Sequence, residues 1–538
     1  KAFKLDKMLC HLSEKMTAAE RELMTHISFF HRGIGVEMLE TLVNAGVSGA
    51  AALAGTNQRQ LLLLVRRLIA RGLAFSHGDG DQRVFTAHPF VRDHFKKLNG
   101  AGATNVHELL RRRLAPSLEH QPGKTTGDKD TLDRFEALIE HTRLSGETEE
   151  AFELYWHGMG GYKHLGPLLG EYRRARRIVE GFSPDGTPAH CALDLPVPRR
   201  TLLLNDWATL ARNVGDLDIA NACMEVAIDL VRREMDQTSL SVALHNVARL
   251  DFLRGRLTTM VRHADEALAM GKVAKDSIET SDSQGLVAFG AFLTGRIAVA
   301  RHNFAEATRV AGEPLRAAIG LWEAKFYHCL GHRDKALEMS LQNLAYCEQK
   351  RYKGITALLY AFIGHLILPD SLAEARRYLA LAGRLSAATD HVEGVIHEKD
   401  LAAAIHLHED HPDLAHAEAS EGFQLAEEHK YGVDAIDLLL TLARAAVARQ
   451  APTEAFRHAK LALERSTQPE CGYVWGKADA LHLMGLAHRD SGERDHARAR
   501  FQQAAEFRAG IEHPGANESR EKAADCDAFE QPVDSFDV

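Results

Sequence analysis

The sequence has few of the residues on which large sheets and irregular folds depend. Aromatic residues make up 7% of the 538 positions, and only 15 residues are proline. Ala, Leu, Glu and Arg, which favour helices, are abundant. This composition argues against a large β-sheet and favours a chain that is mainly helical.

Features of secreted and membrane proteins are also lacking. The seven cysteines form no Cys-x-x-Cys pair and are odd in number, so we expect free thiols in a reducing compartment. No apolar run reaches transmembrane length, and the first residues show no signal-peptide pattern. The sequence therefore predicts a cytoplasmic protein with no membrane contact.

Positive charge is in short supply. Sixty-five basic residues face 74 acidic ones, which gives a net charge of -9. Nucleic acid is thus an unfavoured partner, because general nucleic-acid binding needs a basic surface. The basic runs 111–113 and 173–177 could contact phosphate or an acidic partner. We favour solvated helix faces and intramolecular ion pairs for both.

A helical repeat is clearest near the end of the chain. Gly485 is followed by His488, Ala497, Phe501 and Ala504 at the offsets of the tetratricopeptide pattern. Small residues are required where two paired helices touch, and the large residue fills the gap to the next pair. This spacing predicts two antiparallel helices joined by a short turn.

The small residue near the start of the second helix recurs upstream at a spacing of about 40 residues. We place it at Ala336, Ala375, Ala415, Ala455 and Ala497, and earlier at Ala220 and Met260 after Gly215 and Gly255. The stretch around Ala307 fits less evenly. The period predicts an all-α fold, a right-handed α-solenoid of tetratricopeptide-like helix pairs over residues 131–515.

Two interruptions are expected in this array. The residues around Gly312 and Pro314 should break a helix, and the segment 182–198, which includes Pro196 and Pro198, should be a loop. The final residues, 516–538, are expected to be a polar tail with at most a short helix.

The first hundred residues have a different pattern. We expect helices at 18–29, 37–44 and 58–71, then strands at 73–76 and 83–86. Three helices followed by a hairpin predict a small winged-helix domain over 16–100. A helical connector and loop should occupy 101–130. Because the chain begins with Lys1 and not Met, we expect 1–15 to be a linker from an upstream domain.

This region resembles the winged-helix module of STAND signalling ATPases, the NB-ARC and NACHT-like switch proteins that include maltose-regulator-type activators. The segments that carry the resemblance are MTAAERELMTHISFF, LVRRLIARGLAFS and VFTAHPFVRDHF, which begin at Met16, Leu64 and Val84. In that family a helical sensor, often of tetratricopeptide repeats, follows the module. The resemblance therefore implies that the repeats sense a trigger for a nucleotide-dependent switch.

The same resemblance implies one cofactor-contacting residue, His88. In many relatives a Met-His-Asp element touches the ADP phosphate of the resting state, and the matching stretch here is Ala87-His88-Pro89. Only the histidine is shared, and its imidazole can donate to a phosphate oxygen. The alternative is that His88 caps or packs the junction between strand and helix.

No nucleotide-binding loop is predicted within the chain. Gly123-Lys124-Thr125 matches the end of a P-loop, but Leu118 stands where a glycine is required. We therefore expect no cofactor in this segment, with ADP or ATP bound by a domain before Lys1.

Metal and catalytic sites are not predicted either. The densest histidine cluster is His406, His408, His411 and His416, but His406 and His408 point apart on a helix. We interpret the cluster as a polar turn between helices. No nucleophile motif is present, so this segment is not expected to be an enzyme.

The favoured hypothesis is a sensor and scaffold in which a protein or peptide binds the groove of the repeats. The signal would pass to the upstream switch, with defence or transcription control as the output and oligomerisation as a possible response. Two alternatives remain open. The first is a DNA-binding regulator that reads through residues 58–71, although the leucines at 61–64 suggest a buried face. The second is the regulatory subunit of an enzyme such as a protease.

Overall fold

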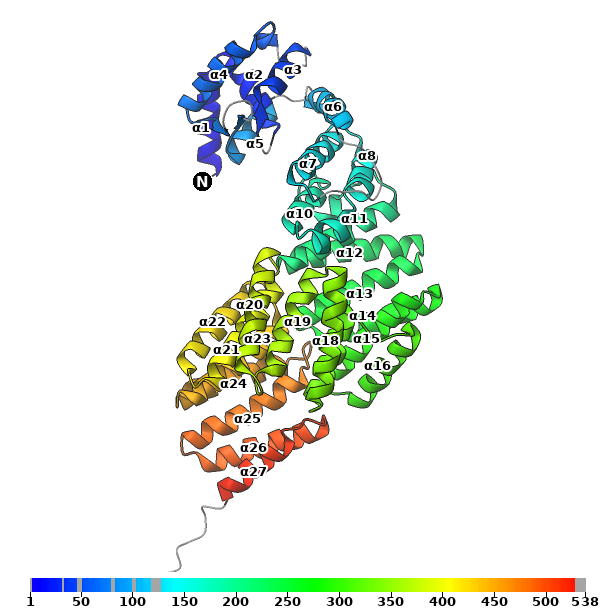
Figure 1. Ribbon diagram of the computed structural model, residues 1–538, viewed down its shortest axis with the longest axis vertical. Helices are drawn as coiled ribbons and strands as arrows, with labels where there is room; N and C mark the ends of the chain where they lie inside the picture. Colours follow the sequence, from blue (N-terminus) through cyan, green and yellow to red (C-terminus); the bar gives the residue numbers. More distant parts are fainter. Residues whose placement is uncertain are drawn as a thin grey trace, which may run out of the picture. The chain divides into compact units, whose positions relative to one another are not determined.

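The computed structural model describes residues 2–30, 33–45, 51–78, 83–98, 103–117 and 127–527. The chain divides into two compact units, Lys1–Gly161 and Tyr162–Val538 (Figure 1). The first unit therefore extends beyond the 101–130 connector and includes the helix pair that the sequence placed at the start of the solenoid. Residues 123–125, the rejected P-loop match, lie outside the described residues.

The first unit begins with a helical core and a small sheet. The strands form a three-stranded antiparallel sheet in the order β1-β3-β2. The two expected strands are present, while β1 is only two residues long and leaves no alternating pattern to recognise. Residues 2–14, expected as a linker, form a helix. The elements are α1 (Ala2–Glu14), α2 (Ala18–Ser28), β1 (Ile34–Gly35), α3 (Val36–Asn44), α4 (Gln58–Ala70), β2 (Phe75–His77), β3 (Val84–Thr86) and α5 (Pro89–Leu98).

Local sequence sets the starts of two of these helices. Thr17 and Glu20 form a reciprocal capping box at α2, and Asn57 and Gln60 form one at α4. Each box satisfies backbone N–H groups that a helix start leaves without an intrahelical partner. Behind these caps, one apolar core joins the helices to the sheet; it includes Leu23, Ile27, Leu39, Leu61, Val65, Phe85 and Phe95.

The rest of the first unit consists of α6 (Ala103–Leu114), α7 (Lys129–Leu144) and α8 (Thr148–Glu153), which continues as a π-helical turn over Leu154–Gly158. A pair of buried histidines joins α6 to α7. The Nδ1 atoms of His107 and His141 lie 3.1 Å apart, and the two side chains are 4% and 1% exposed. Phe29 and Phe30, which directly follow α2, pack edge-on against these rings.

The second unit begins irregularly before its helix pairs start. A π-helical turn at His164–Leu168 and α10 (Tyr172–Gly181) precede a loop that contains a short 3-10 helix, Pro188–His190. The loop ends at Pro196, earlier than the sequence suggested, because Pro198 lies in the first turn of the next helix. A proline is tolerated there, since its missing N–H would have no helical partner.

Antiparallel helix pairs then follow one another to the end of the described chain, so the second unit is an all-α solenoid. The break around Gly312 lies where the sequence predicted it, and residues 516–527 of the expected tail form a helix that packs on the last pair. The helices are α11 (Val197–Asn213), α12 (Leu217–Glu234), α13 (Gln237–Leu253), α14 (Leu257–Ala274), α15 (Ser277–Leu293), α16 (Ile297–Ala311), α17 (Ala317–Cys329), α18 (Arg333–Lys350), α19 (Lys353–Ile367), α20 (Leu372–Ala388), α21 (Val392–His408), α22 (Pro412–Glu428), α23 (Gly432–Ala448), α24 (Pro452–Ser466), α25 (Val474–Asp490), α26 (Arg494–Gly510) and α27 (Ala516–Asp527).

The predicted small residues occupy the contacts between paired helices. Every one of them is 0% exposed: Ala220, Met260, Ala336, Ala375, Ala415, Ala455 and Ala497. The repeat also continues through Gly295 and Ala300, which accounts for the stretch around Ala307 that fitted the spacing less evenly. Near the end, a Cβ on Gly485 would lie 2.7 Å from the Phe501 ring, which explains the glycine at this position.

The superhelix is wound so tightly that its successive turns touch. His429 Nδ1 lies 3.1 Å from the Gly215 carbonyl oxygen, and Thr258 donates to the Pro469 carbonyl. Partners in these contacts are 211 to 219 residues apart, which corresponds to about five repeats. We call this set of contacts the seam.

Glycines make the seam possible. Gly215, Gly255 and Gly295 adopt positive φ angles of 79°, 73° and 81° at the turn between paired helices. The same residues face the other side of the seam, where a Cβ on Gly215 would lie 2.5 Å from His429. These positions therefore require glycine both for the backbone conformation and for the close approach.

Within the part of the chain that the structure describes, no helix is both long and apolar enough to cross a membrane.

The seam predicts that Gly432→Ala destabilises the second unit. The added Cβ would lie 2.5 Å from the Arg254 carbonyl oxygen and 3.0 Å from the Gly255 nitrogen, and backbone atoms cannot rotate away. We expect a loss of about 1–3 kcal/mol, measured as a lower thermal midpoint. Gly510→Ala is the matched control, because a Cβ there meets nothing within 4 Å. Equal midpoints for the two variants would contradict the seam.

The histidine pair predicts that the first unit loses stability in acid. Burial, followed by the positive charge that His141 would carry, lowers the pKa of His107 to about 3. Because the unfolded chain binds a proton near pH 6.5 and the folded chain does not, stability is complete above that pH and falls as the pH drops toward 3. We expect a loss of roughly 2 kcal/mol from this residue at pH 5. Thermal midpoints should therefore fall less steeply between pH 7.5 and pH 5 in His107→Gln than in the exposed control His77→Gln.

Candidate functional site

The first helices of the pairs bring ionisable side chains together in the interior of the second unit. These residues are far apart in sequence yet lie within electrostatic range of one another. We call them the axial cluster: Arg212, Arg249, Lys325, His391, Glu393, His397, Asp400, Asp434, Asp437 and Asp479. They come from α11, α13, α17, α21, α23 and α25.

One end of the axial cluster contains two arginines. Burial lowers the pKa of Arg249 to about 10, and neighbouring Arg212 adds to the effect. Burial also raises the pKa of Glu393, but Arg249 and His391 outweigh it and hold this pKa below the usual value. The two arginines thus lie beside ionised Glu393, and Asp206 is a further acidic group in the same neighbourhood.

The middle of the axial cluster is acidic. Burial raises the pKa of Asp437 to about 7, and the neighbouring Asp400 raises it further. Burial, and then Glu393, raises the pKa of Asp434 well above its usual value. The positive charge of Lys325 acts on both carboxyls and partly offsets these increases in pKa. His365 pairs with Asp400 and holds the pKa of that carboxyl at about 2. Asp434 and Asp437, whose pKa values are raised, are therefore the carboxyls that a further positive charge would stabilise in the ionised form.

The far end is already neutralised. Arg508 donates to Asp479 at 2.8 Å, and Arg444 donates to the other carboxylate oxygen at 2.8 Å. Although burial raises the pKa of Asp479, these two arginines outweigh it and hold this pKa below its usual value. The end with the two arginines is therefore followed by an acidic segment, and the acidic segment by Asp479, whose charge is paired.

Water reaches these groups even though protein surrounds them. Side chains of His397, Asp400 and Asp479 are 23%, 27% and 22% exposed, whereas Glu393 and Asp434 are 9% exposed. Partly hydrated charges at a protein interior are costly unless something compensates them. An arrangement of this kind suits reversible binding of a charged ligand.

The thiols near the site are not nucleophiles. Burial raises the pKa of Cys329 to about 12, and Asp437 and Asp479 raise it further. Burial also raises the pKa of Cys471, and the neighbouring Asp437 raises it further. Both thiols are protonated at neutral pH, so neither supplies the thiolate that covalent catalysis requires.

A cavity of about 330 Å³ lies at the seam. Its wall includes Arg176, Asp216, Asp218, His429 and Lys430. The charges in the wall are already paired, Arg176 with Asp216 at 2.8 Å and Lys430 with Asp218. We therefore assign this cavity to the packing of the seam.

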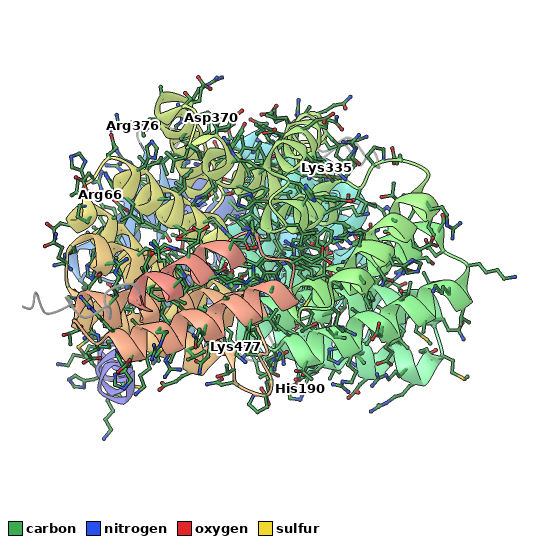
Figure 2. The ribbon with its side chains drawn as sticks, turned by 90° about the horizontal axis from the view of Figure 1, so that it is seen from below. Arg66, His190, Lys335, Asp370, Arg376 and Lys477 are labelled. Atoms are coloured by element: carbon green, nitrogen blue, oxygen red, sulfur yellow. The ribbon has the colours of Figure 1, made fainter. Side chains whose placement is uncertain are left out.

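Charged residues on the outer surface behave differently from the axial cluster. Asp370 and Arg376 point away from the repeats in Figure 2, with side chains 67% and 57% exposed. Each has its own partner, Arg333 for Asp370 and Glu409 for Arg376. Ion pairs at such exposed positions contribute little to stability. Asp370 therefore serves below as the control position for substitutions in the axial cluster.

His88, the site residue implied by the resemblance, lies exposed at the start of α5. Its backbone carbonyl accepts hydrogen bonds from the N–H groups of Val91 and Arg92, and its ring stacks on Phe90 with centroids 5.4 Å apart. The ring stands at a helix N-terminus, where anions are favoured. Its role toward a phosphate stays a prediction.

The basic runs largely form intramolecular pairs, the alternative that we favoured. Arg111 and Arg112 pair with Glu108, Arg173 pairs with Asp390, and Arg176 pairs with Glu180. This arrangement leaves few free cations in either run.

Helix α4 bears on the DNA-binding alternative. Its leucine run is not uniformly buried, since Leu61 is 0% and Leu63 is 51% exposed. Arg59, Arg66 and Arg67 are exposed. This helix therefore does not present the fully buried leucine face that the sequence suggested, so the leucine run does not exclude contact with DNA. Nucleic-acid binding stays untested.

The histidine cluster is arranged in an unexpected way. His406 and His411 approach one another together with Glu409, while His408 takes no part. His416 joins a separate group with Glu454 and His458. His406 and His408 point apart, as expected from the sequence, but this does not bear on His406, Glu409 and His411, which the turn brings together.

The axial cluster itself was not recognised in the sequence. Its members have no common motif, and each alone is typical of a polar helix position. One local signal does exist: Glu393, His397 and Asp400 recur at helical spacing on α21. A polar stripe on a helix expected to face the inside of a solenoid marks the inner surface.

Neither a protein-family model nor a curated protein matches the sequence. Among solved structures, the chain is similar to a signal transduction ATPase with numerous domains from Pyrococcus horikoshii that has a tetratricopeptide-repeat sensor, at 12% identity, TM-score 0.36 and 93% of this chain. The chain spans 64% of that protein's length.

Two Rap proteins are also similar. The Rap conjugation gene regulator of plasmid pLS20, in complex with the Phr* peptide, is 11% identical over 68% of this chain and 97% of that one, with TM-score 0.42. A Rap protein complexed with competence and sporulation factor is 13% identical over 78% and 99% of the two chains, with TM-score 0.37. All three likenesses are distant.

Proposed function

We propose that the second unit is a binding module and not an enzyme, and that it holds a peptide or an extended protein segment along the axial cluster. The observation that carries the proposal is the convergence of ionisable groups from six helices on one line. A solenoid that only needed to be stable would place apolar side chains there, since buried charge is costly without a partner. Clusters of perturbed ionisable groups are typical of functional sites.

The charge pattern defines the ligand. A cationic group, such as a lysine or arginine side chain or an N-terminal amine, would bind among Asp400, Asp434 and Asp437. An anionic group, such as a carboxylate, would bind near Arg212 and Arg249. A peptide carries both groups on one flexible chain, which suits a long inner surface made of helix pairs.

Ligand binding would act on the conformation of the whole solenoid. The axial cluster joins helices that belong to different turns of the superhelix, and the seam joins the same turns at their edge. A ligand held by α13, α17 and α23 would therefore favour the closed winding over a more open one. Such a difference in affinity between two states is what a sensor requires.

The proposal predicts that Asp437→Asn weakens binding of a basic peptide without unfolding the protein. The probe is a set of fluorescent positional-scanning octapeptide libraries with Lys, Gln or Glu fixed at one position, followed by anisotropy. We expect the Lys libraries to bind best and the variant to lose about tenfold in affinity, as for a lost charge-assisted hydrogen bond. Binding should strengthen from pH 6 to pH 8, because the Asp437 carboxyl has a pKa of about 7 and ionises over that range.

The matched control is Asp370→Asn, the same substitution on the outer surface, where the side chain is 67% exposed. The folded pKa of Asp437 is raised, so its ionisation opposes folding as the pH rises through about 7. Since the unfolded carboxyl ionises near pH 4, Asp437→Asn should raise the thermal midpoint at pH 8 and change it little at pH 4. Equal affinity in the two variants, or a preference for the Glu libraries, would overturn the proposal.

We further infer that the first unit relays this binding to a nucleotide switch. The support is the resemblance to the winged-helix module of STAND ATPases, together with the order of helices and strands in residues 18–98 and the exposed ring of His88. In this arrangement the His88 imidazole donates to a phosphate of ADP bound by a domain of the intact protein. Ligand binding to the repeats would then favour the open state, in which the contact between His88 and the phosphate is lost.

This relay predicts that His88→Ala weakens ADP retention in the intact protein that includes the nucleotide-binding domain. The measurement is the amount of ADP that co-purifies, followed by its dissociation rate. His77→Ala is the control, because His77 is also exposed and lies on β2 of the same sheet. If His88→Ala retains as much ADP as the wild type, the proposed contact with the phosphate is wrong. His88 would then have only its packing role at the start of α5.

A further inference from the structure

Three groups of histidine and acidic residues in the described part of the chain have ligand atoms close enough to hold a metal ion. They are His406 with Glu409 and His411, His416 with Glu454 and His458, and His488 with Glu493 and His496. In each group the ligand atoms lie within 4.8 Å of one another. Their hydrogen bonds distinguish the three.

Two of the groups are explained by ion pairing. Glu454 accepts from His416 at 3.0 Å and from Arg449 at 3.0 Å, with Arg457 at 3.7 Å. His488 Nδ1 lies 2.6 Å from Glu493, a hydrogen bond that already uses both groups. A metal ion would have to displace these partners. In the group that contains Glu454 it would also lie close to two arginines.

The remaining group, His406 with Glu409 and His411, is different, because two of its ligand atoms face each other without a hydrogen-bond partner. His406 Nδ1 and Glu409 Oε2 are buried atoms that make no hydrogen bond, and they lie 3.9 Å apart. Buried polar atoms normally have a hydrogen-bond partner, so two adjacent exceptions call for an explanation. An ion bound between them would satisfy both atoms.

The surrounding structure orients these ligands. Arg376 donates to the other carboxylate oxygen of Glu409, Oε1, and thereby fixes the direction of Oε2. Outer contacts of this kind commonly hold a ligating carboxylate in place. The backbone N–H of His411 donates to the His406 carbonyl at 2.9 Å and closes the turn between α21 and α22. His411 itself is exposed, so the third ligand can adjust as an ion enters.

We propose that His406, Glu409 and His411 form a site for a divalent transition-metal ion of the zinc class. Two imidazoles and one carboxylate, with water in the fourth position, match the preferences of Zn²⁺, whose bonds to nitrogen and oxygen are about 2.0–2.2 Å. The ligands would close by about 1 Å from their present spacing. The ion would lie at the C-terminal end of α21, where the helix dipole favours positive charge.

The site would have a structural role. Helix α21 carries Glu393, His397 and Asp400 of the axial cluster along its length, and His406 in its last turn. A metal ion that joins His406 to His411 would fix the turn after α21 and restrict the movement of this helix. The site does not depend on peptide binding, so each proposal stands or fails separately.

The test is a titration of the purified chain, treated with chelator and with its thiols alkylated, with Zn²⁺ in a calorimeter and with Co²⁺ in a visible spectrometer. We expect one equivalent of Zn²⁺ to bind with micromolar or tighter affinity and Co²⁺ to give the absorption of a four- or five-coordinate ion. The thermal midpoint should rise with added Zn²⁺, since an ion bound only to the folded state stabilises it.

Variants identify the ligands. His411→Asn should weaken Zn²⁺ binding at least tenfold while the apo protein keeps its midpoint, because the side chain is exposed. Glu409→Gln should have the same effect. His408→Asn, in the same turn but outside the group, and His416→Asn, in the neighbouring group, are matched controls that should bind as the wild type does. No Zn²⁺ binding at 100 µM, or binding that His411→Asn and Glu409→Gln leave unchanged, would overturn the proposal.

Discussion

The close approach of successive turns of the superhelix is the constraint on which the rest of the second unit depends. Gly215, Gly255 and Gly295 each end the first helix of a pair with a positive φ angle and leave no side chain on the seam. Residues about five repeats later can therefore pack directly against them. A wider winding would separate α13 and α17 from α21 and α23, and the axial cluster would not form.

This winding creates an electrostatic environment that no single repeat contains. Arg249 lies near Glu393, and Lys325 lies near Asp434 and Asp437, although more than one hundred residues separate the members of each pair. Enclosure raises the cost of every charge, so Asp434 and Asp437 keep their protons to higher pH, whereas Asp400, which pairs with His365, does not. A cationic ligand bound beside Asp434 and Asp437 would offset the free-energy cost of ionising them. Tight winding and ligand binding are thus two consequences of one geometry.

Helix α21 connects several of these features. Its first turns supply His391 and Glu393 to the end with the two arginines, its middle supplies Asp400 to the acidic segment, and its last turn holds His406. Small rotations of this helix would change the spacing of charges along the whole axis. The first unit has a different kind of sensitivity, since burial against His141 lowers the pKa of His107 to about 3 and opposes its protonation in the folded state. Charge enclosed within each unit is therefore a source of conformational response.

The sequence by itself determined the repeated unit, because contacts between paired helices are local and need a small residue at a fixed place. Ala336, Ala375, Ala415, Ala455 and Ala497 could be located from spacing, and the break at Gly312 from the glycine and the nearby Pro314. Only the tertiary structure decided how the repeats wind, since small rotations between neighbouring pairs add up over about five repeats and have no local signature. The axial cluster and the seam follow from that sum. The approach of Glu409 to His406 and His411 was likewise decided by the turn conformation at Asp410, which spacing along a helix does not describe.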